Sequence, residues 1–403
     1  MIKRYIKRGK YLQKVAPFID KDIIKVFVGQ RRVGKSYLLF QIMDVIRKEN
    51  PHAHIIYINK EKFEFDDIVD YKTLLLYVKE KSSRKHKNYL FIDEIQDIAQ
   101  FEKALRSLKA DGNYDIYCTG SNANLLSGEL ATYLSGRYIE IPVYSLDYQE
   151  FLMFHKLQNT EDSFDKYIRF GGMPYLMHLE LKEEIVFDYL HSVYNTILLK
   201  DVVSRYKIRN VSFLKNLVRY VADNIGAVVS AKKISDFLIS QRIKISPNIV
   251  LDYLSYLHNT FFIYKVPRID VKGRKIFEVG EKYYFEDVGL RNAIVGYAHS
   301  DINKVLENVV FVHLMSNGYH VFVGQLKEKE IDFVAEKNNE RIYVQVAYKI
   351  HEDNYEREFG NLLKIADSYK KIVVSADSYI GHKTHQGIKH VHITDFLLED
   401  VTV

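Results

Sequence analysis

The chain has 403 residues, of which 47% are hydrophobic and 27% charged, and its formal net charge is +6. This length predicts two to four domains, and this composition excludes an intrinsically disordered chain. No apolar run reaches the ~18 residues that cross a bilayer, and the N-terminus lacks a signal-peptide pattern, so we expect no membrane contact. The single cysteine, Cys118, cannot form an internal disulfide, which favours the cytoplasm.

Residues 23–49 carry the strongest pattern. An apolar, β-branched run at 23–28 predicts a buried strand, and apolar residues at helical spacing follow residue 37. Between them stands GQRRVGKS, a complete G-x-x-x-x-G-K-S pattern. Glycines let the backbone curl so that its N–H groups surround phosphates at the start of a helix. The order strand, loop and helix therefore predicts a nucleotide site rather than a chance glycine turn.

Each residue of this loop has an expected role. Lys35 would neutralise the β- and γ-phosphates, and the hydroxyl of Ser36 would hold Mg²⁺. The expected nucleotide-binding residues are Gly29, Gln30, Arg31, Arg32, Val33, Gly34, Lys35, Ser36 and Tyr37.

A second strand, in NYLFIDEIQDI, ends in two carboxylates. In P-loop proteins an acidic residue at this strand end binds the Mg²⁺ shell, which suits Asp93. Glu94 is placed to polarise a water for attack on the γ-phosphate, a step that hydrolases need. The alternative is that Glu94 caps a following helix.

Two further catalytic candidates follow in chain order. A third strand, in YDIYCTGS, ends near Thr119, Ser121 and Asn122, of which Ser121 is our choice for contact with the γ-phosphate or the water. The alternative is an N-cap for the next helix. Arg137 precedes another strand, where it could stabilise transition-state charge on a neighbouring subunit's nucleotide. Its alternative is a solvated surface arginine.

These pieces together resemble a prokaryotic ATPase of the AAA superfamily. The matching stretches are GQRRVGKS, LFIDEIQ, TGSNANLL, LSGR and YSLDYQEFL, followed by RFGGMPYL and TILLKDVVSRYKIRN. The resemblance covers the whole chain, to a branch that ends in a domain of unknown function with a nuclease-like fold. It implies an α/β fold with a five-stranded parallel sheet, the cofactors ATP and Mg²⁺, and a helical lid. The lid shows no obvious second sensor arginine.

The resemblance and the composition shifts divide the chain into four parts. These are a P-loop ATPase core at 1–145, a helical lid at 146–205, a winged-helix domain at 206–280 and a nuclease-like α/β domain at 281–403. The winged-helix interpretation follows from three helix patterns and a strand-like exit. Its basic residues are candidates for contacts with DNA phosphates, or else a solvated face of a protein-binding module: Lys232, Lys233, Arg242 and Lys244.

The last part resembles a PD-(D/E)xK nuclease, which holds Mg²⁺ on two acidic ligands and adds a lysine two residues beyond the second. Asp332 would supply the first ligand, with support from Glu307. Gln345 offers only a neutral carbonyl, and Ala347 stands at the lysine position. Lys349 would share a strand face with Gln345 and Ala347, about 6.6 Å beyond Ala347 at ~3.3 Å per residue. These departures favour a domain kept for docking a partner or DNA over an active nuclease.

Three functions therefore compete. The first is an ATPase that couples hydrolysis to conformational change in its appended modules and acts on DNA or a protein partner, with a homo-oligomer as one arrangement. The second is a nucleotide-gated binding switch with little hydrolysis, and the third is an ATP-regulated nuclease. Glu94 favours the first over the second, and Ala347 weighs against the third.

Overall fold

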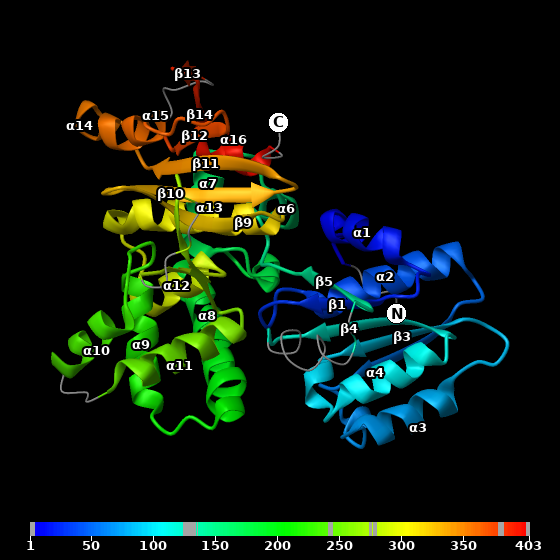
Figure 1. The fold of residues 1–403 in the computed structure, drawn as a ribbon. Helices are drawn as coiled ribbons and strands as arrows, with labels where there is room; N and C mark the ends of the chain where they lie inside the picture. The colour runs from blue at the N-terminus through cyan, green and yellow to red at the C-terminus, as the bar shows by residue number, and fades with distance from the viewer. Residues whose placement is uncertain are drawn as a thin grey trace. The chain divides into compact units, whose positions relative to one another are not determined.

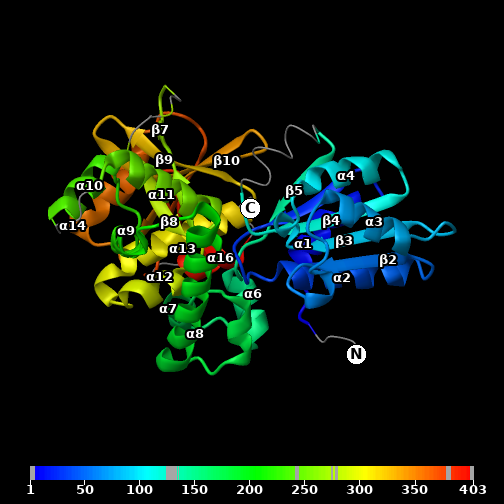
Figure 2. The same cartoon turned by 90° about the horizontal axis from the view of Figure 1, so that it is seen from below.

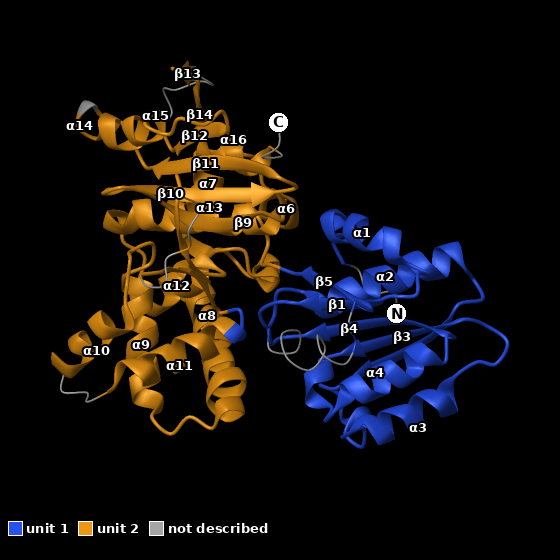
Figure 3. Ribbon diagram, in the orientation of Figure 1, with its two compact units in different colours: residues 1–143, 259–261 blue, residues 144–258, 262–403 orange. Residues whose placement is uncertain are grey.

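The structure is a computed structural model that describes residues 5–123, 134, 136–240, 245–273, 276, 280–377 and 383–399. The chain forms two compact units (Figure 3). Unit 1 contains residues 1–143 and 259–261, and unit 2 contains residues 144–258 and 262–403. The predicted four-part division remains a prediction within these two units. None of the helices in the described segments has the length and apolar character that a membrane crossing needs.

Unit 1 is built on a five-stranded sheet in the order β2-β3-β4-β1-β5. All neighbouring strands run parallel, with Val26 beside Cys118 and Ile58 beside Ile92. The strands are β1 (Ile24–Val28), β2 (His54–Asn59), β3 (Asn88–Asp93), β4 (Tyr114–Gly120) and β5 (Tyr138–Pro142). The expected five-stranded parallel sheet, with the P-loop after its first strand, is confirmed.

Helices cover both faces of this sheet. In Figures 1 and 2, α2 lies on one face and α3 and α4 lie on the other. Because both faces are covered, β1 and β3 are buried at every position and are mainly apolar, with Lys25 of β1 paired to Asp115. The helical segments are α1 (Gly9–Val15), η1 (Ala16–Phe18), α2 (Lys35–Glu49), η2 (Phe63–Phe65), α3 (Tyr71–Lys81), η3 (Ile95–Asp97) and α4 (Phe101–Ala110).

Unit 2 begins with a helical region. Its core joins helices from α8 to α11 with the start of α12 through Leu190, Leu217, Leu254 and Leu290. The segments are α6 (Tyr148–His155), α7 (Glu161–Phe170), η5 (Pro174–His178), α8 (Glu183–Thr196), η6 (Ile197–Ser204, a π-helix), α9 (Val211–Asp223), α10 (Ala231–Ser240), α11 (Pro247–Asn259), α12 (Val288–Val295) and η7 (His299–Asp301).

A mixed seven-stranded sheet completes unit 2, in the order β13-β14-β12-β11-β10-β9-β7. Strands β9, β10 and β11 are antiparallel, whereas β11, β12 and β14 run parallel. The strands are β7 (Arg268–Asp270), β9 (His320–Leu326), β10 (Lys329–Lys337), β11 (Glu340–Ala347), β12 (Lys370–Ser375), β13 (Lys383–His385) and β14 (Ile388–His392). The helices packed with this sheet are α13 (Ile302–Ser316), α14 (Glu352–Tyr355), η8 (Glu356–Gly360), α15 (Asn361–Leu363) and α16 (Ile393–Leu398).

The helical region and the large sheet are interleaved in sequence. Strands β6 (Ile263–Val266) and β8 (Lys282–Phe285) form an antiparallel pair of their own. Strand β7, which lies between them in sequence, instead pairs with β9 of the large sheet. The predicted boundary at residues 280 and 281 therefore falls between strands that pair across it.

Candidate nucleotide site

The P-loop runs from the end of β1 into α2, and its two glycines make this path possible. Gly34 has a φ of 98°, in the left-handed region that glycine tolerates. At Gly29 a Cβ would lie 2.1 Å from the carbonyl oxygen of Val143, so a side chain has no room. The loop thus depends on both glycines for the close curl that a phosphate cradle requires.

Lys35 begins α2, and its side chain is only 4% exposed. Its amino group donates hydrogen bonds to the carbonyl oxygens of Gly29 and Gln30, each at 2.9 Å. The N-cap of α2 is Gly34, which has no side chain that could cap the N–H groups of the first turn. A positive charge and these N–H groups meet at the loop, which suits a phosphate group.

The other loop residues have different surroundings. Arg31 forms an ion pair of 2.7 Å with Glu61, and Val33 lies in the hydrophobic core. The guanidinium group of Arg8 holds the carbonyl oxygen of Val33 at 3.0 Å and so braces the loop from the N-terminal segment. Tyr37 is half-exposed on α2. Nucleotide contact by individual side chains of this set remains a prediction.

Asp93 is buried at the end of β3 and is surrounded by hydroxyl groups. Thr119 donates a hydrogen bond of 2.6 Å to this carboxylate and Tyr57 one of 3.2 Å, and the hydroxyl group of Ser36 lies near enough to act on its pKa. Burial raises the pKa of Asp93, against the lowering effects of Thr119, Ser36 and Lys35. The structure therefore brings together the two expected Mg²⁺ ligands, Ser36 and Asp93, although they are 57 residues apart in sequence.

Glu94 lies beside Asp93 and is 6% exposed. Burial acts to raise its pKa, but the charges of Lys35 and Arg31 and the hydrogen bonds from Gln96 and Ser121 lower the pKa below its ordinary value. Glu94 occupies the N-cap position of η3, yet its side chain makes no capping hydrogen bond. The geometry thus gives no support to the alternative of a helix cap.

At the end of β4, Ser121 and Thr119 each bind a different one of the two carboxylates. Ser121 donates a hydrogen bond of 3.2 Å to the Glu94 carboxylate. Thr119 binds Asp93 and also accepts the backbone N–H of Glu94 at 2.9 Å. Of the expected helix that these residues would cap, residues 124–130 lie outside the described part of the chain.

Arg137 is exposed and directly precedes β5. Its carbonyl oxygen accepts the N–H of Ile24 at the start of β1, whereas the P-loop follows the end of β1. Five residues of strand, about 16 Å, therefore separate Arg137 from the P-loop along the sheet.

Sequence reasoning missed three residues that shape this site: Arg8, Tyr57 and Gln96. Gln96 donates to both Glu94 and Ser121, and its own carbonyl oxygen is buried without a partner. Its place two residues after Glu94 was the available signal. Arg8 and Tyr57 belong to segments without a motif, so only the fold identifies them.

The residues present fit a magnesium nucleotide. A hydroxyl group and a carboxylate supply oxygen ligands of the kind that Mg²⁺ prefers, next to a lysine and uncapped helix N–H groups. The buried amide oxygen of Gln96 has no partner and lies beside the Glu94 carboxylate, where a water could satisfy it.

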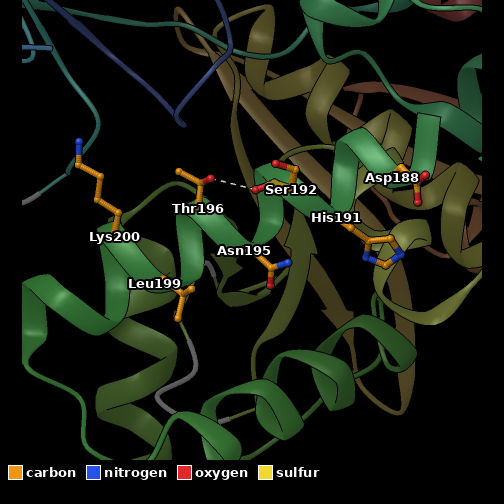
Figure 4. Close-up of a pocket in the computed structure, with 7 residues that line it drawn as sticks. All are labelled: Asp188, His191, Ser192, Asn195, Thr196, Leu199 and Lys200. Atoms are coloured by element: carbon orange, nitrogen blue, oxygen red, sulfur yellow. Dashed lines mark hydrogen bonds between the residues drawn. The ribbon is translucent and has the colours of Figure 1, made fainter. Parts of the chain in front are cut away.

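A separate surface pocket of about 480 Å³ lies on α8 and η6 (Figure 4). Within it, Thr196 donates a hydrogen bond to the carbonyl oxygen of Ser192 one turn earlier. The lining residues are Asp188, His191, Ser192, Asn195, Thr196, Leu199 and Lys200. Thr196, Leu199 and Lys200 belong to the stretch TILLKDVVSRYKIRN, but no lining residue was among the predicted site residues.

Three of the four candidates in the C-terminal region lie near one another in the structure, and the fourth, Lys349, does not. Asp332 is buried, its carboxylate accepts the N–H of Val346 at 2.8 Å, and the charge of Glu307 acts on it. Gln345 accepts the N–H of Asp332 at 3.3 Å, which places these two side by side. Lys349 does not join them, because β11 ends at Ala347 and Lys349 is exposed beyond it. The expected strand face shared by Gln345 and Lys349 was wrong.

The basic candidates of the helical region are only partly described. Lys232 and Lys233 are exposed on α10. Arg242 and Lys244 lie outside the described residues.

Comparisons with known proteins place the candidate nucleotide site within an AAA domain. The model of an AAA domain matches residues 21–152, and that of a domain of unknown function, DUF8612, matches residues 161–301. An uncharacterized protein of Haemophilus influenzae is 39% identical over 99% of this chain and 100% of its own length. An uncharacterized protein of Methanocaldococcus jannaschii is 32% identical over 86% of this chain and 81% of its own length.

The chain belongs to this family of AAA-domain proteins. Among solved structures, the Walker-type ATPase of Pyrococcus abyssi matches 72% of this chain and 96% of its own, with a TM-score of 0.49 and 16% identity. The AAA domain spans the P-loop, Asp93, Glu94, Ser121 and Arg137, so the candidate nucleotide site lies within it.

A lysine substitution tests phosphate binding by this AAA domain. Lys35→Ala removes a buried, charge-assisted donor, so we expect the affinity for a fluorescent ATP analogue to fall about 10- to 100-fold. Lys48→Ala, at an exposed lysine of the same helix, is the matched control and should bind as the parent does. Equal affinity of the Lys35→Ala and parent proteins would show that the amino group does not contact the nucleotide.

Proposed function

We propose that this protein binds ATP with Mg²⁺ and hydrolyses it. The observation that carries the proposal is the buried carboxylate of Glu94, next to the Ser36–Asp93 pair and within the electrostatic reach of Lys35. A lowered pKa keeps Glu94 ionised at neutral pH, as a base that accepts a proton from water must be. A protein that only changed conformation when it bound a nucleotide, without hydrolysing it, would not need such a base.

Two side chains must move when ATP binds. The amino group of Lys35 now holds the carbonyl oxygens of Gly29 and Gln30, and it would exchange one of them for a phosphate oxygen. Glu94 is held by Gln96 and Ser121, so it must release at least one of them to reach a water. Bound Mg²⁺ would neutralise charge on the phosphates.

Substitution of Glu94 separates binding from hydrolysis. Glu94→Gln keeps the size of the side chain but removes its basicity, so we expect ATP binding to persist while kcat falls about 10²- to 10⁴-fold. Phosphate release under saturating ATP measures kcat, and Glu64→Gln, at an exposed glutamate, is the control. Parental kcat in Glu94→Gln would remove Glu94 as the base, and absence of hydrolysis in the parent would favour the switch.

We further propose that hydrolysis requires a homo-oligomer. Arg137 lies at the opposite edge of the sheet from its own P-loop, so a catalytic role is open to it only across a subunit interface. An arginine supplied in this way stabilises the charge that develops on the transferred phosphoryl group.

The concentration dependence of activity tests this assignment. Activity per chain should rise with protein concentration, and Arg137→Ala should bind ATP normally while kcat falls about 10³-fold or more. Arg106→Ala, at an exposed arginine on α4, should behave as the parent does. Constant activity per chain from a monomeric sample would remove the trans role.

The remaining parts of the chain would respond to the nucleotide. We propose that α9, α10 and α11 with β6 and β8 form a winged helix, and that the C-terminal sheet with α13 has a nuclease-like fold. Three helices followed by an antiparallel strand pair support the first assignment, and a helix before three antiparallel strands supports the second. Both parts lie in unit 2.

The partner of this region is proposed to be a protein rather than DNA. In a winged helix the third helix enters the groove, yet α11 contains no lysine or arginine and exposes Ile249, Leu251 and Asp252. Such a surface lacks the charge that binds phosphates and carries the apolar side chains found in protein interfaces. The exposed lysines, Lys232 and Lys233, lie on α10.

Duplex binding at low salt distinguishes the two classes of partner. At about 50 mM salt, where contacts with DNA phosphates are strong, we expect the parent and the Lys232→Ala/Lys233→Ala variant to have the same weak affinity for a DNA duplex. Gel shifts at increasing salt measure this. A shift that weakens steeply with salt and is lost in the double variant would assign DNA to this surface.

A further inference from the structure

Lys282, on β8, is a buried lysine that reaches from the small strand pair into the acidic cluster of the large sheet. Its side chain is 3% exposed. Its amino group lies 2.9 Å from Oε1 of Glu307 on α13 and 2.8 Å from Oε1 of Glu330 on β10. A lysine ammonium has three donors and no acceptor, so two carboxylates already use most of its capacity.

The surrounding groups are mainly acidic. Asp332 and Glu358 are both buried, and the hydroxyl group of Tyr284 donates to Glu307. Burial acts to lower the pKa of Lys282, but the charges of Glu307, Asp332 and Glu330 outweigh burial and raise it. The ammonium therefore stays charged, and it is the cation around which these carboxylates gather.

One oxygen of this cluster has no partner. Oε2 of Glu358 is buried without a hydrogen bond, and so is Oδ1 of Asn361 three residues later. The charge of Glu358 acts on Asp332, and its other oxygen, Oε1, pairs with Arg357 at 3.3 Å. Oxygen atoms of this kind are metal ligands in proteins, so the cluster has the chemistry of a cation site.

The arrangement nevertheless does not fit the divalent metal of a nuclease-like fold. In the part of the chain that the structure describes, no three His, Cys, Asp or Glu side chains are placed to hold a metal ion. Gln345 contributes an amide in place of a carboxylate, and its oxygen already accepts the N–H of Asp332. Meanwhile Lys282 brings a positive charge to the carboxylates that a metal would use.

We propose that the Lys282 ammonium is a built-in cation that takes the place of a divalent metal in this cluster. The cluster then ties β8 to α13 and β10 without metal, and it does not cleave nucleic acid. Removal of the ammonium alone leaves the carboxylates around an empty centre, which a divalent ion can fill.

Binding of Mn²⁺ to nucleotide-free protein tests the proposal. The parent should show no Mn²⁺ site that depends on Asp332, as measured by electron paramagnetic resonance and compared with Asp332→Asn. Lys282→Ala should bind Mn²⁺ at least about tenfold more tightly than the parent, and Lys282→Ala/Asp332→Asn should lose this gain. Lys265→Ala, at an exposed lysine paired with Glu281 just before β8, should gain no site.

Thermal unfolding gives a second measurement. In the presence of a chelator, Lys282→Ala should unfold at a lower temperature than the parent, and Mn²⁺ should restore much of the loss. Lys282→Arg keeps the charge and should gain no Mn²⁺ site. A Lys282→Ala protein that folds only with Mn²⁺ also supports the proposal.

Two results would overturn it. The first is a Mn²⁺ site in the parent that disappears in Asp332→Asn, because the cluster would then bind metal with Lys282 in place. The second is cleavage of DNA or RNA by the parent with Mg²⁺ or Mn²⁺ that disappears in Glu307→Ala. Neither measurement requires Lys282→Ala to fold.

Discussion

The candidate nucleotide site depends on a buried carboxylate that cannot remain without partners. Asp93 lies at the edge where the parallel strands of unit 1 end, and an unpaired charge there would be costly. Hydroxyl groups from β4, β2 and α2 all turn toward it, through Thr119, Tyr57 and Ser36. One carboxylate thereby fixes three elements around the P-loop, and Thr119 extends the same network to the backbone of Glu94.

Local patterns explain how much of this could be predicted from sequence. The P-loop, Asp93 and Glu94 each follow a buried apolar strand, and parallel strands bring such ends to one edge. A short-range pattern does not report distant partners, so Tyr57 and Arg8 were not predicted. The prediction for Lys349 was wrong for a related reason. The prediction assumed that β11 continued, but the strand ends at Ala347, and an alternation of faces has no meaning beyond it.

The same limit explains why Lys282 was overlooked. It lies at the very start of the stretch predicted to be the nuclease-like domain, 25 residues before Glu307 in sequence, and belongs to no motif. Only the pairing of β8 with β6, and the packing of α13 beside them, brings the lysine to its carboxylates. The two acidic centres of the chain therefore differ in how their charge is balanced. In the first, hydroxyl groups and the lysine at the start of α2 surround the carboxylates, and in the second, a lysine from another strand pairs with them.

The interleaved strands of unit 2 constrain how this protein could be divided by evolution or by a protease. Strand β7 pairs with β9, while its sequence neighbours β6 and β8 pair with each other. A fragment that stopped between β7 and β8 would leave β6 without its partner and would expose the edge of β9 in the other fragment. We therefore expect gene fusion or deletion to add or remove the helical region and the large sheet together.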